Sequence, residues 1–252
     1  MGFKSNFVKL FNKFEDLFLA NHACISCRRE VLDGAKFSLC GTCLKELDVI
    51  DGRTCLKCGD KLNADVLLCD RCNGTEFHFD KNYSLVRYDD ISGRIIKRFK
   101  YSSRKYYAKY IAELMTQNTK IFESIDYLTF VPIGEKRRRE RGFNQAEEIA
   151  REISKLTGKE VVEILRKVGN EKHQAGLSQK ERMENLKDSF VLVDESIELL
   201  KGKTILIIDD VFTTGATLSE CAKVIKSIKK SKPKAVISYT FAKTELFSSK
   251  KG

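Results

Sequence analysis

The stretch from Ile205 to Thr217, which reads ILIIDDVFTTGAT, constrains the fold of this chain more than any other. Its four consecutive aliphatic residues, Ile205 to Ile208, are typical of a strand that is buried on both faces of a parallel sheet. Two carboxylates, Asp209 and Asp210, follow at once, where such a strand leaves the sheet at its carboxyl end. Open α/β sheets bind their ligands at that edge. We therefore expect a ligand site directly after this strand.

A short loop rich in hydroxyl groups follows the two aspartates and leads into a helix. Apolar residues at helical spacing from Leu218 to Ile228 place the start of the helix near the end of this loop. The N-terminus of a helix presents unpaired N–H groups to an anion, and a glycine at position 215 lets the backbone approach a ligand closely. The loop is therefore predicted to bind a phosphate group through Thr213, Thr214, Gly215, Ala216 and Thr217.

The acid pair suits a different part of the ligand. Carboxylates are unsuited to a phosphate, but they bind ribose hydroxyls, and they bind Mg²⁺ through oxygen. An acid pair followed by a phosphate loop therefore predicts a sugar phosphate that is bound together with a divalent metal. A strand–turn–helix unit with a polar turn and no ligand is the alternative on spacing alone.

The same stretch resembles the phosphoribosyl pyrophosphate motif of type I phosphoribosyltransferases. This resemblance implies that Asp209 and Asp210 hold the ribose 2′- and 3′-hydroxyls. It also implies that Thr213 to Thr217 surround the 5′-phosphate.

Eight of the nine cysteines form four CxxC pairs, which are separated by 12, 11 and 10 residues. Two such pairs complete a tetrahedral Cys₄ zinc site. The N-terminal residues are apolar but interrupted by charges, so no secretory signal is expected and a reducing cytoplasm favours metal binding over disulfides. We predict two structural zinc ions, bound by Cys24, Cys27, Cys40, Cys43, Cys55, Cys58, Cys69 and Cys72.

The pairing of these cysteines has two solutions. Neighbouring pairs would build two successive zinc ribbons, whereas interleaved pairs would build a cross-brace. Successive ribbons are favoured because each closes a short loop at a smaller entropic cost. A site with four sulfur ligands leaves no position for water, so its role is structural; iron is an alternative on the ligands alone. The ninth cysteine, Cys221, is predicted to be an inert buried residue on a helix.

Length and charge divide the chain into parts. A chain of 252 residues holds one α/β domain and something small. We expect an amphipathic helix over residues 1–20, a double zinc ribbon over 21–80 and a phosphoribosyltransferase-like domain over 81–252. In that domain, strands alternate with helices, which predicts an α/β fold with a mostly parallel sheet flanked by helices.

The excess of positive charge lies in the third part, residues 81–252. Residues 1–80 carry 11 basic and 12 acidic residues, and the remainder carries 35 basic and 23 acidic residues. A nucleic-acid partner is therefore expected on the C-terminal domain rather than on the ribbons. No apolar run is long enough to cross a bilayer, although the N-terminal helix has a membrane-surface anchor as its alternative.

A basic segment from Lys136 to Arg141 directly follows a predicted strand, Leu128 to Ile133. A solvated charged surface is the usual explanation of such a run. Its position at a strand end favours a role in binding, because guanidinium groups suit a diphosphate. The residues predicted to bind the ligand in this region are Val131, Pro132, Arg137, Arg138 and Arg141.

The wider pattern resembles the ComF (ComFC) family of bacterial natural transformation. The matching features occur in the same order from Cys24 onward: the CxxC pairs, FKY at Phe99 to Tyr101, VPI at Val131 to Ile133, RGFNQA at Arg141 to Ala146, Gln174, Leu177, Arg182 and Asn185, and IIDDVFTTGAT. The resemblance implies that the arginine-rich segment lies in the pyrophosphate loop. It also implies that residues from about Gly169 to Arg182 form a flexible loop over the substrate.

Two functions fit these features. Displacing pyrophosphate from ribose needs fixed charges and a metal rather than a protein nucleophile, so Asp209 and Asp210 are the candidate catalytic residues. A pocket for an incoming base is not recognisable, which leaves a transferase reaction permitted but not shown. On resemblance we favour a competence protein that binds phosphoribosyl pyrophosphate with Mg²⁺ and single-stranded DNA, with other competence proteins as further partners. The alternative is an active phosphoribosyltransferase in nucleotide salvage or amide transfer.

Aromatic residues near the basic segment offer a way to bind unpaired bases by stacking. They are Tyr101, Tyr106, Tyr107 and Phe143. Packing in the core is the alternative, and we favour it for Tyr106 and Tyr107.

Overall fold

The computed structural model describes residues 23–31, 36–101, 104–117, 119–168, 189–228 and 230–244. The predicted N-terminal helix over residues 1–20 lies outside the described residues. So does the predicted substrate loop from Gly169 to Arg182, together with the matching residue Asn185. Within the described ranges, no helix combines the length and the apolar character that crossing a membrane requires.

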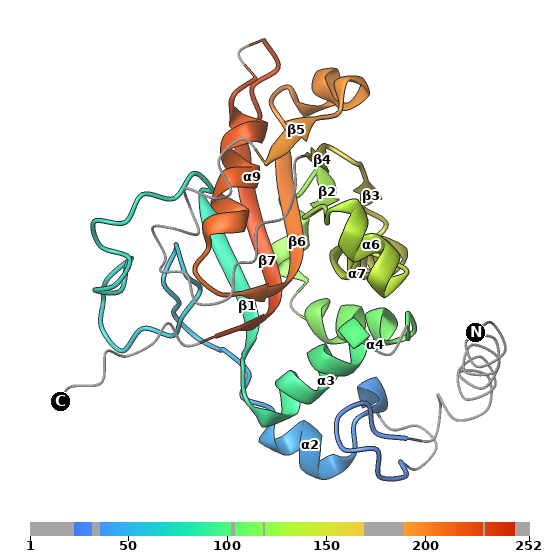
Figure 1. Ribbon diagram of the computed structural model, residues 1–252. Coiled ribbons are helices and arrows are strands. Elements are labelled where there is room, and N and C mark those ends of the chain that lie inside the picture. The colour runs from blue at the N-terminus through green and yellow to red at the C-terminus, as the bar shows by residue number, and fades with distance from the viewer. Residues whose placement is uncertain are drawn as a thin grey trace, which may run out of the picture.

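A five-stranded sheet with all neighbours parallel forms the centre of the molecule (Figure 1). In spatial order its strands are β1 (Lys81–Arg87), β7 (Ala235–Lys243), β6 (Thr204–Phe212), β2 (Tyr127–Phe130) and β3 (Glu160–Val161). The aliphatic run of β6 is fully buried because alternate side chains enter the cores on the two faces of the sheet. The predicted α/β fold with a mostly parallel sheet is confirmed.

Helices cover both faces of this sheet (Figure 1). On one face lie α3 (Asp90–Tyr101), α4 (Tyr107–Met115), α5 (Lys120–Glu123) and α7 (Gln145–Thr157), and on the other lies α9 (Ala216–Lys226). The helix after the basic segment is α7, which Asn144 caps by accepting a hydrogen bond from the Ala146 N–H and which ends at Gly158.

The shorter elements lie around this frame. They are a 3₁₀ turn η1 (Lys36–Ser38), α2 (Gly41–Glu46), α6 (Glu135–Arg141), β4 (Leu165–Lys167), β5 (Phe190–Leu192) and a 3₁₀ segment η2 (Asp194–Leu200). The strands β3 and β4 are separate, because β3 ends at Val161 and β4 begins at Leu165. The strands β4 and β5 pair with each other, antiparallel, and not with the main sheet.

The structure corrects the end of the central strand. We expected the strand to leave the sheet before Asp209, but β6 continues to Phe212. It continues because β7 extends equally far and pairs with it, Asp209 with Thr240 and Phe212 with Lys243. The two aspartates are therefore held by the sheet itself and not by a loop.

The basic segment is also better ordered than expected. It forms the helix α6 rather than a loop, and Gly142 ends this helix with a left-handed φ of 80°. None of its side chains is buried. The charges of the segment are therefore presented on a short exposed helix.

The two cysteine-rich segments pack on opposite faces of the sheet. Cys24, Ile25 and Cys43 join the core beneath α3, α4 and α7, whereas Cys55 and Phe79 join the core beneath α9. The chain between them follows the outer edge of β1, where the Ile50 N–H donates to the Leu85 carbonyl at 2.8 Å. This contact protects a strand edge that would otherwise be open.

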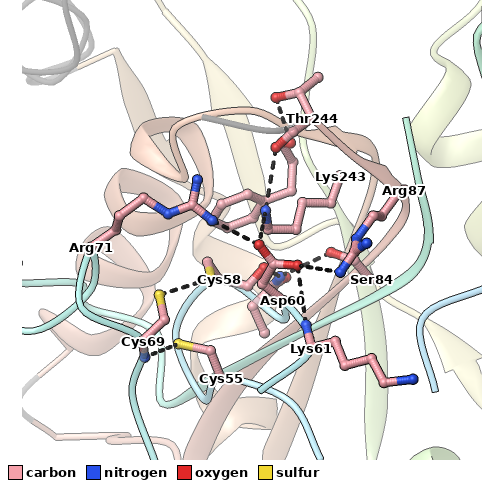
Figure 2. Close-up of polar contacts among 12 residues, drawn as sticks. Cys55, Cys58, Asp60, Lys61, Cys69, Arg71, Ser84, Arg87, Lys243 and Thr244 are labelled. Carbon is pink, nitrogen blue, oxygen red and sulfur yellow. Dashed lines mark hydrogen bonds and ion pairs between the residues drawn. The ribbon is translucent and has the colours of Figure 1, made fainter. Parts of the chain in front are cut away.

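Asp60 joins the second cysteine-rich segment to the ends of β1 and β7 (Figure 2). Its carboxylate lies 2.8 Å from Arg71 Nη2, 3.0 Å from Lys243 Nζ and 3.5 Å from Arg87 Nη2. The side chain of Lys243 is only 1% exposed. Burial alone would raise the pKa of Asp60, but the three cations outweigh it and hold this pKa below its usual value.

Candidate functional site

The eight paired cysteines form two clusters. Within each cluster the sulfur atoms lie within 4.8 Å of one another, and neighbouring CxxC pairs share a cluster. The Sγ atoms of Cys27 and Cys40 are 3.6 Å apart, and those of Cys58 and Cys69 are 3.7 Å apart. A tetrahedral zinc ion with Zn–S bonds of about 2.3 Å requires sulfurs about 3.8 Å apart. Both clusters therefore fit structural zinc, in the successive arrangement that loop entropy favours.

The ninth cysteine is separate from these clusters. Cys221 is fully buried on α9, as predicted, and burial raises the pKa of its thiol.

Apart from the two cysteine clusters, a group of polar side chains surrounds a cavity of about 140 Å³ at the carboxyl ends of β2 and β6. It lies where ligands bind in open α/β sheets. Among the residues predicted to bind the ligand, it brings together Val131, Pro132, Arg137, Arg141, Asp209, Asp210 and Thr217. Residues that were not predicted also line it: Lys100, Ile133, Asn144, Gln145, Ala146, Lys167 and Phe190.

The aspartates differ in their surroundings. Asp210 is 8% exposed, and its Oδ2 atom lies 2.7 Å from Nζ of Lys100, which α3 brings to the cavity. The Asp210 N–H donates to Asp209 Oδ1 at 2.8 Å. Burial and the negative charge of Asp210 raise the pKa of Asp209 to about 7. A cation bound nearby would stabilise the charged form of Asp209.

The predicted phosphate loop is a tight turn between β6 and α9. Gly215 has a φ of +78°, and the Ala216 N–H contacts Thr214 Oγ1 at 3.4 Å. A Cβ atom at position 215 would lie 2.7 Å from the rings of both Phe212 and Phe77. Only glycine fits here, although the close approach is to aromatic rings and not to the ligand that we expected.

Phe77 comes from the chain that directly follows the second cysteine cluster. The backbone N–H of the next residue, His78, donates to Ser219 Oγ in the first turn of α9 at 3.1 Å. Phe79 contacts Phe212 edge to face, with 6.4 Å between the ring centroids. The chain that follows the second cysteine cluster therefore packs against the turn at Gly215 and the start of α9.

The predicted arginines divide into two groups. Arg137 and Arg141 line the cavity, and Arg141 Nη1 donates to Gln145 Oε1 at 3.0 Å. Arg138 is not part of the cavity lining and instead lies 3.3 Å from Glu147 with its side chain 59% exposed. A role for Arg138 in ligand binding stays a prediction.

Gln145 is a site residue that sequence reasoning missed. It is 2% exposed, and within the described part of the chain its Nε2 atom has no hydrogen-bond partner. Its Oε1 atom accepts a hydrogen bond from Arg141, which holds the Gln145 side chain in place. The Nε2 atom of the same side chain remains without an acceptor among the described residues. A buried donor without an acceptor costs free energy, which a ligand oxygen would recover. The match of RGFNQA was the only sequence signal for it.

Most of the aromatic candidates are packed in the core. Tyr107 is fully buried, as we favoured, and Phe143 is 3% exposed and packs against Phe99. The suggestion that Phe143 stacks on bases is therefore wrong. Tyr101 is 75% exposed and is available for such a contact.

Comparison with known proteins gives two family models and several relatives. Residues 14–73 match the double zinc ribbon domain, and residues 139–247 match the phosphoribosyl transferase domain. Competence protein F of Haemophilus influenzae is 30% identical over 218 residues, which cover 82% of this chain and 92% of that protein. The chain belongs to the ComF family.

Other relatives of this ComF chain carry related names. Competence protein ComFC of Bacillus subtilis is 25% identical, and the match covers 82% of this chain and 84% of that protein. DNA utilization protein YhgH of Escherichia coli is 27% identical, and the match covers 80% of this chain and 89% of that protein. A crystal structure of an adenine phosphoribosyltransferase is similar with a TM-score of 0.37 and 14% identity, over 60% of this chain and 76% of that one.

Proposed function

We propose that this ComF chain binds phosphoribosyl pyrophosphate together with Mg²⁺ in the cavity at the ends of β2 and β6. We further propose that its basic domain binds single-stranded DNA during DNA uptake. The observation that carries the first proposal is the convergence of an acid pair, Thr217 in the first turn of α9 and several cations on one cavity. Each of these groups matches one part of the ligand.

Different residues would bind different parts of the ligand. Asp209 and Asp210 would hold the ribose hydroxyls, and the turn before α9 together with the start of that helix would receive the 5′-phosphate on residues Thr213 to Thr217. Arg137 and Arg141 would bind the diphosphate with their guanidinium groups. Lys100 lines the same cavity and would exchange its contact with Asp210 for one with the same anion.

The acid pair fits a divalent cation. Oxygen ligands are those that Mg²⁺ prefers, and Asp209 has a raised pKa that a nearby cation would lower. When bound, Mg²⁺ would neutralise charge on the diphosphate. The chain's own groups would orient the ligand, the two aspartates through the ribose and the two arginines through the diphosphate.

We test this function with two variants, Asp209→Asn and Asp210→Asn, in calorimetric titrations with phosphoribosyl pyrophosphate and Mg²⁺. Each lost contact to a charged group should weaken binding about 10- to 100-fold. Asp194→Asn is the control, because Asp194 is exposed and lies outside the cavity lining. Unchanged affinity in both site variants would show that the ligand binds elsewhere. Release of pyrophosphate by the wild type with a base or an amine would favour the transferase alternative.

The DNA-binding part of the proposal has its own measurement. Affinity for a single-stranded oligonucleotide should fall steeply with added salt, because each phosphate contact releases counterions. Affinity that does not respond to salt would contradict a role of the basic domain.

A further prediction concerns Gln145. Gln145→Leu should weaken the binding of phosphoribosyl pyrophosphate about 10-fold, because the ligand loses the donor that we assign to Nε2. The melting temperature should change little, because the lost hydrogen bond from Arg141 is offset by the removal of an unsatisfied buried amide donor. The control is Gln117→Leu, an exposed residue outside this cavity that should change neither measurement. A large fall in stability would contradict the assignment.

A further inference from the structure

Tyr101 is exposed in a way that the packing of the fold does not explain. It is the last residue of α3 and is 75% exposed, the highest value for a large apolar side chain in the described ranges. The other aromatic residue of the FKY motif, Phe99, is fully buried. The phenol ring is therefore presented to solvent at the end of a helix that is otherwise anchored in the core.

The surroundings of this ring are cationic. A second cavity of about 320 Å³ is lined by Lys100, Tyr101, Arg137, Glu140 and Arg141. The guanidinium carbon of Arg141 lies 6.0 Å from the centroid of the Tyr101 ring. An aromatic face beside three basic groups fits a planar base joined to phosphates.

The same three cations serve both cavities. Lys100, Arg137 and Arg141 also line the cavity that contains Asp209 and Asp210. The cavity at Tyr101 and the proposed sugar-diphosphate site are therefore neighbours that share these lining residues. Anions bound in both would draw on the same positive charges and repel each other.

The helix α6 continues the positive surface away from Tyr101. The side chains of Arg138 and Arg139 are 59% and 76% exposed. Arg138 lies 3.3 Å from Glu147, which is 12% exposed and also contacts Arg151 at 2.9 Å. Arg139 pairs with the exposed Glu135 at 3.9 Å, and such a surface ion pair contributes little to stability. Phosphate groups of a polymer can replace such partners at small cost.

We propose that single-stranded DNA binds across Tyr101 and α6, with one base stacked on the Tyr101 ring and its phosphates on the arginines of α6. We propose also that DNA and phosphoribosyl pyrophosphate oppose each other's binding, because they share Lys100, Arg137 and Arg141. Both statements rest on the proposed function. Linkage requires the effect to be reciprocal, so each ligand raises the dissociation constant of the other by the same factor.

The test measures fluorescence anisotropy of a labelled oligothymidylate with the full chain. Tyr101→Ala should weaken binding roughly 10-fold, the loss of one base stacked on an aromatic side chain. Tyr101→Phe should bind like the wild type, since the ring is kept. Tyr88→Ala is the control, because Tyr88 is also exposed, at 43%, but lies outside both cavities. An oligomer of abasic nucleotides, with the same phosphates, should bind the wild type and Tyr101→Ala equally.

Saturating phosphoribosyl pyrophosphate with Mg²⁺ should raise the dissociation constant of the oligonucleotide about 5- to 100-fold. Equal affinity of the wild type and Tyr101→Ala for oligothymidylate would overturn the stacking site. Unchanged DNA affinity in the presence of phosphoribosyl pyrophosphate, at a concentration that calorimetry shows to saturate, would overturn the shared cations. A wild type that binds no single-stranded DNA at all would instead refute the proposed function.

Discussion

Gly215→Ala is expected to lower the free energy of unfolding by about 2–5 kcal/mol, because it combines backbone strain with overpacking. The φ of +78° disfavours any side chain, and the new Cβ would lie 2.7 Å from the rings of Phe212 and Phe77. These rings pack against the turn that we propose to bind the 5′-phosphate, so the turn has to move. We therefore also expect the binding of phosphoribosyl pyrophosphate to fall by more than 10-fold, measured by calorimetry beside urea unfolding.

Gly158→Ala separates the two causes. Gly158 has a similar φ of +70° at the end of α7, but a Cβ there would meet nothing within 4 Å. It should cost only the strain of the left-handed backbone, about 1 kcal/mol, and leave ligand binding unchanged. Equal effects of the two substitutions would contradict the packing of Phe77 against the loop.

Asp60→Ala is expected to lower the free energy of unfolding by about 3–5 kcal/mol, because it leaves a buried cation without its counter-charge. That cation is Lys243, whose side chain is 1% exposed and whose Nζ lies 3.0 Å from Asp60 Oδ2. Arg71 and Arg87 also lose a contact, but both are partly exposed and can be solvated. Urea unfolding of the zinc-loaded chain measures the effect.

The control for Asp60 is another aspartate of the same segment. Asp51 contacts Lys61 at 2.6 Å, but the two side chains are 75% and 49% exposed. Asp51→Ala should therefore cost about 0–1 kcal/mol. A similarly small loss in Asp60→Ala would show that the second ribbon is not tied to β1 and β7 through this carboxylate.

The parts of the fold that the sequence predicted are those with local signals. The aliphatic run of β6 and the apolar spacing of α9 each depend on residues close in sequence, and both elements begin where they were expected. The CxxC spacing likewise predicted the two cysteine clusters. The domain limits at residues 20 and 80 remain predictions.

The features that were missed depend on contacts between distant residues. The end of β6 is set by its partner strand β7, which no pattern within ILIIDDVFTTGAT reveals. Lys100 reaches Asp210 from a helix that lies more than 100 residues earlier, and His78 meets Ser219 across 141 positions. The basic segment was predicted as a loop because its charges hid the short helix that Gly142 ends. Such contacts arise only when the chain folds.

The most direct test of the central claim is a crystal structure of the chain with phosphoribosyl pyrophosphate and Mg²⁺. The account predicts ribose hydroxyls at Asp209 and Asp210, the 5′-phosphate at the turn around Gly215, and the diphosphate near Arg137 and Arg141. Density for the ligand at any other place, or an empty cavity at saturating ligand and Mg²⁺, would contradict it.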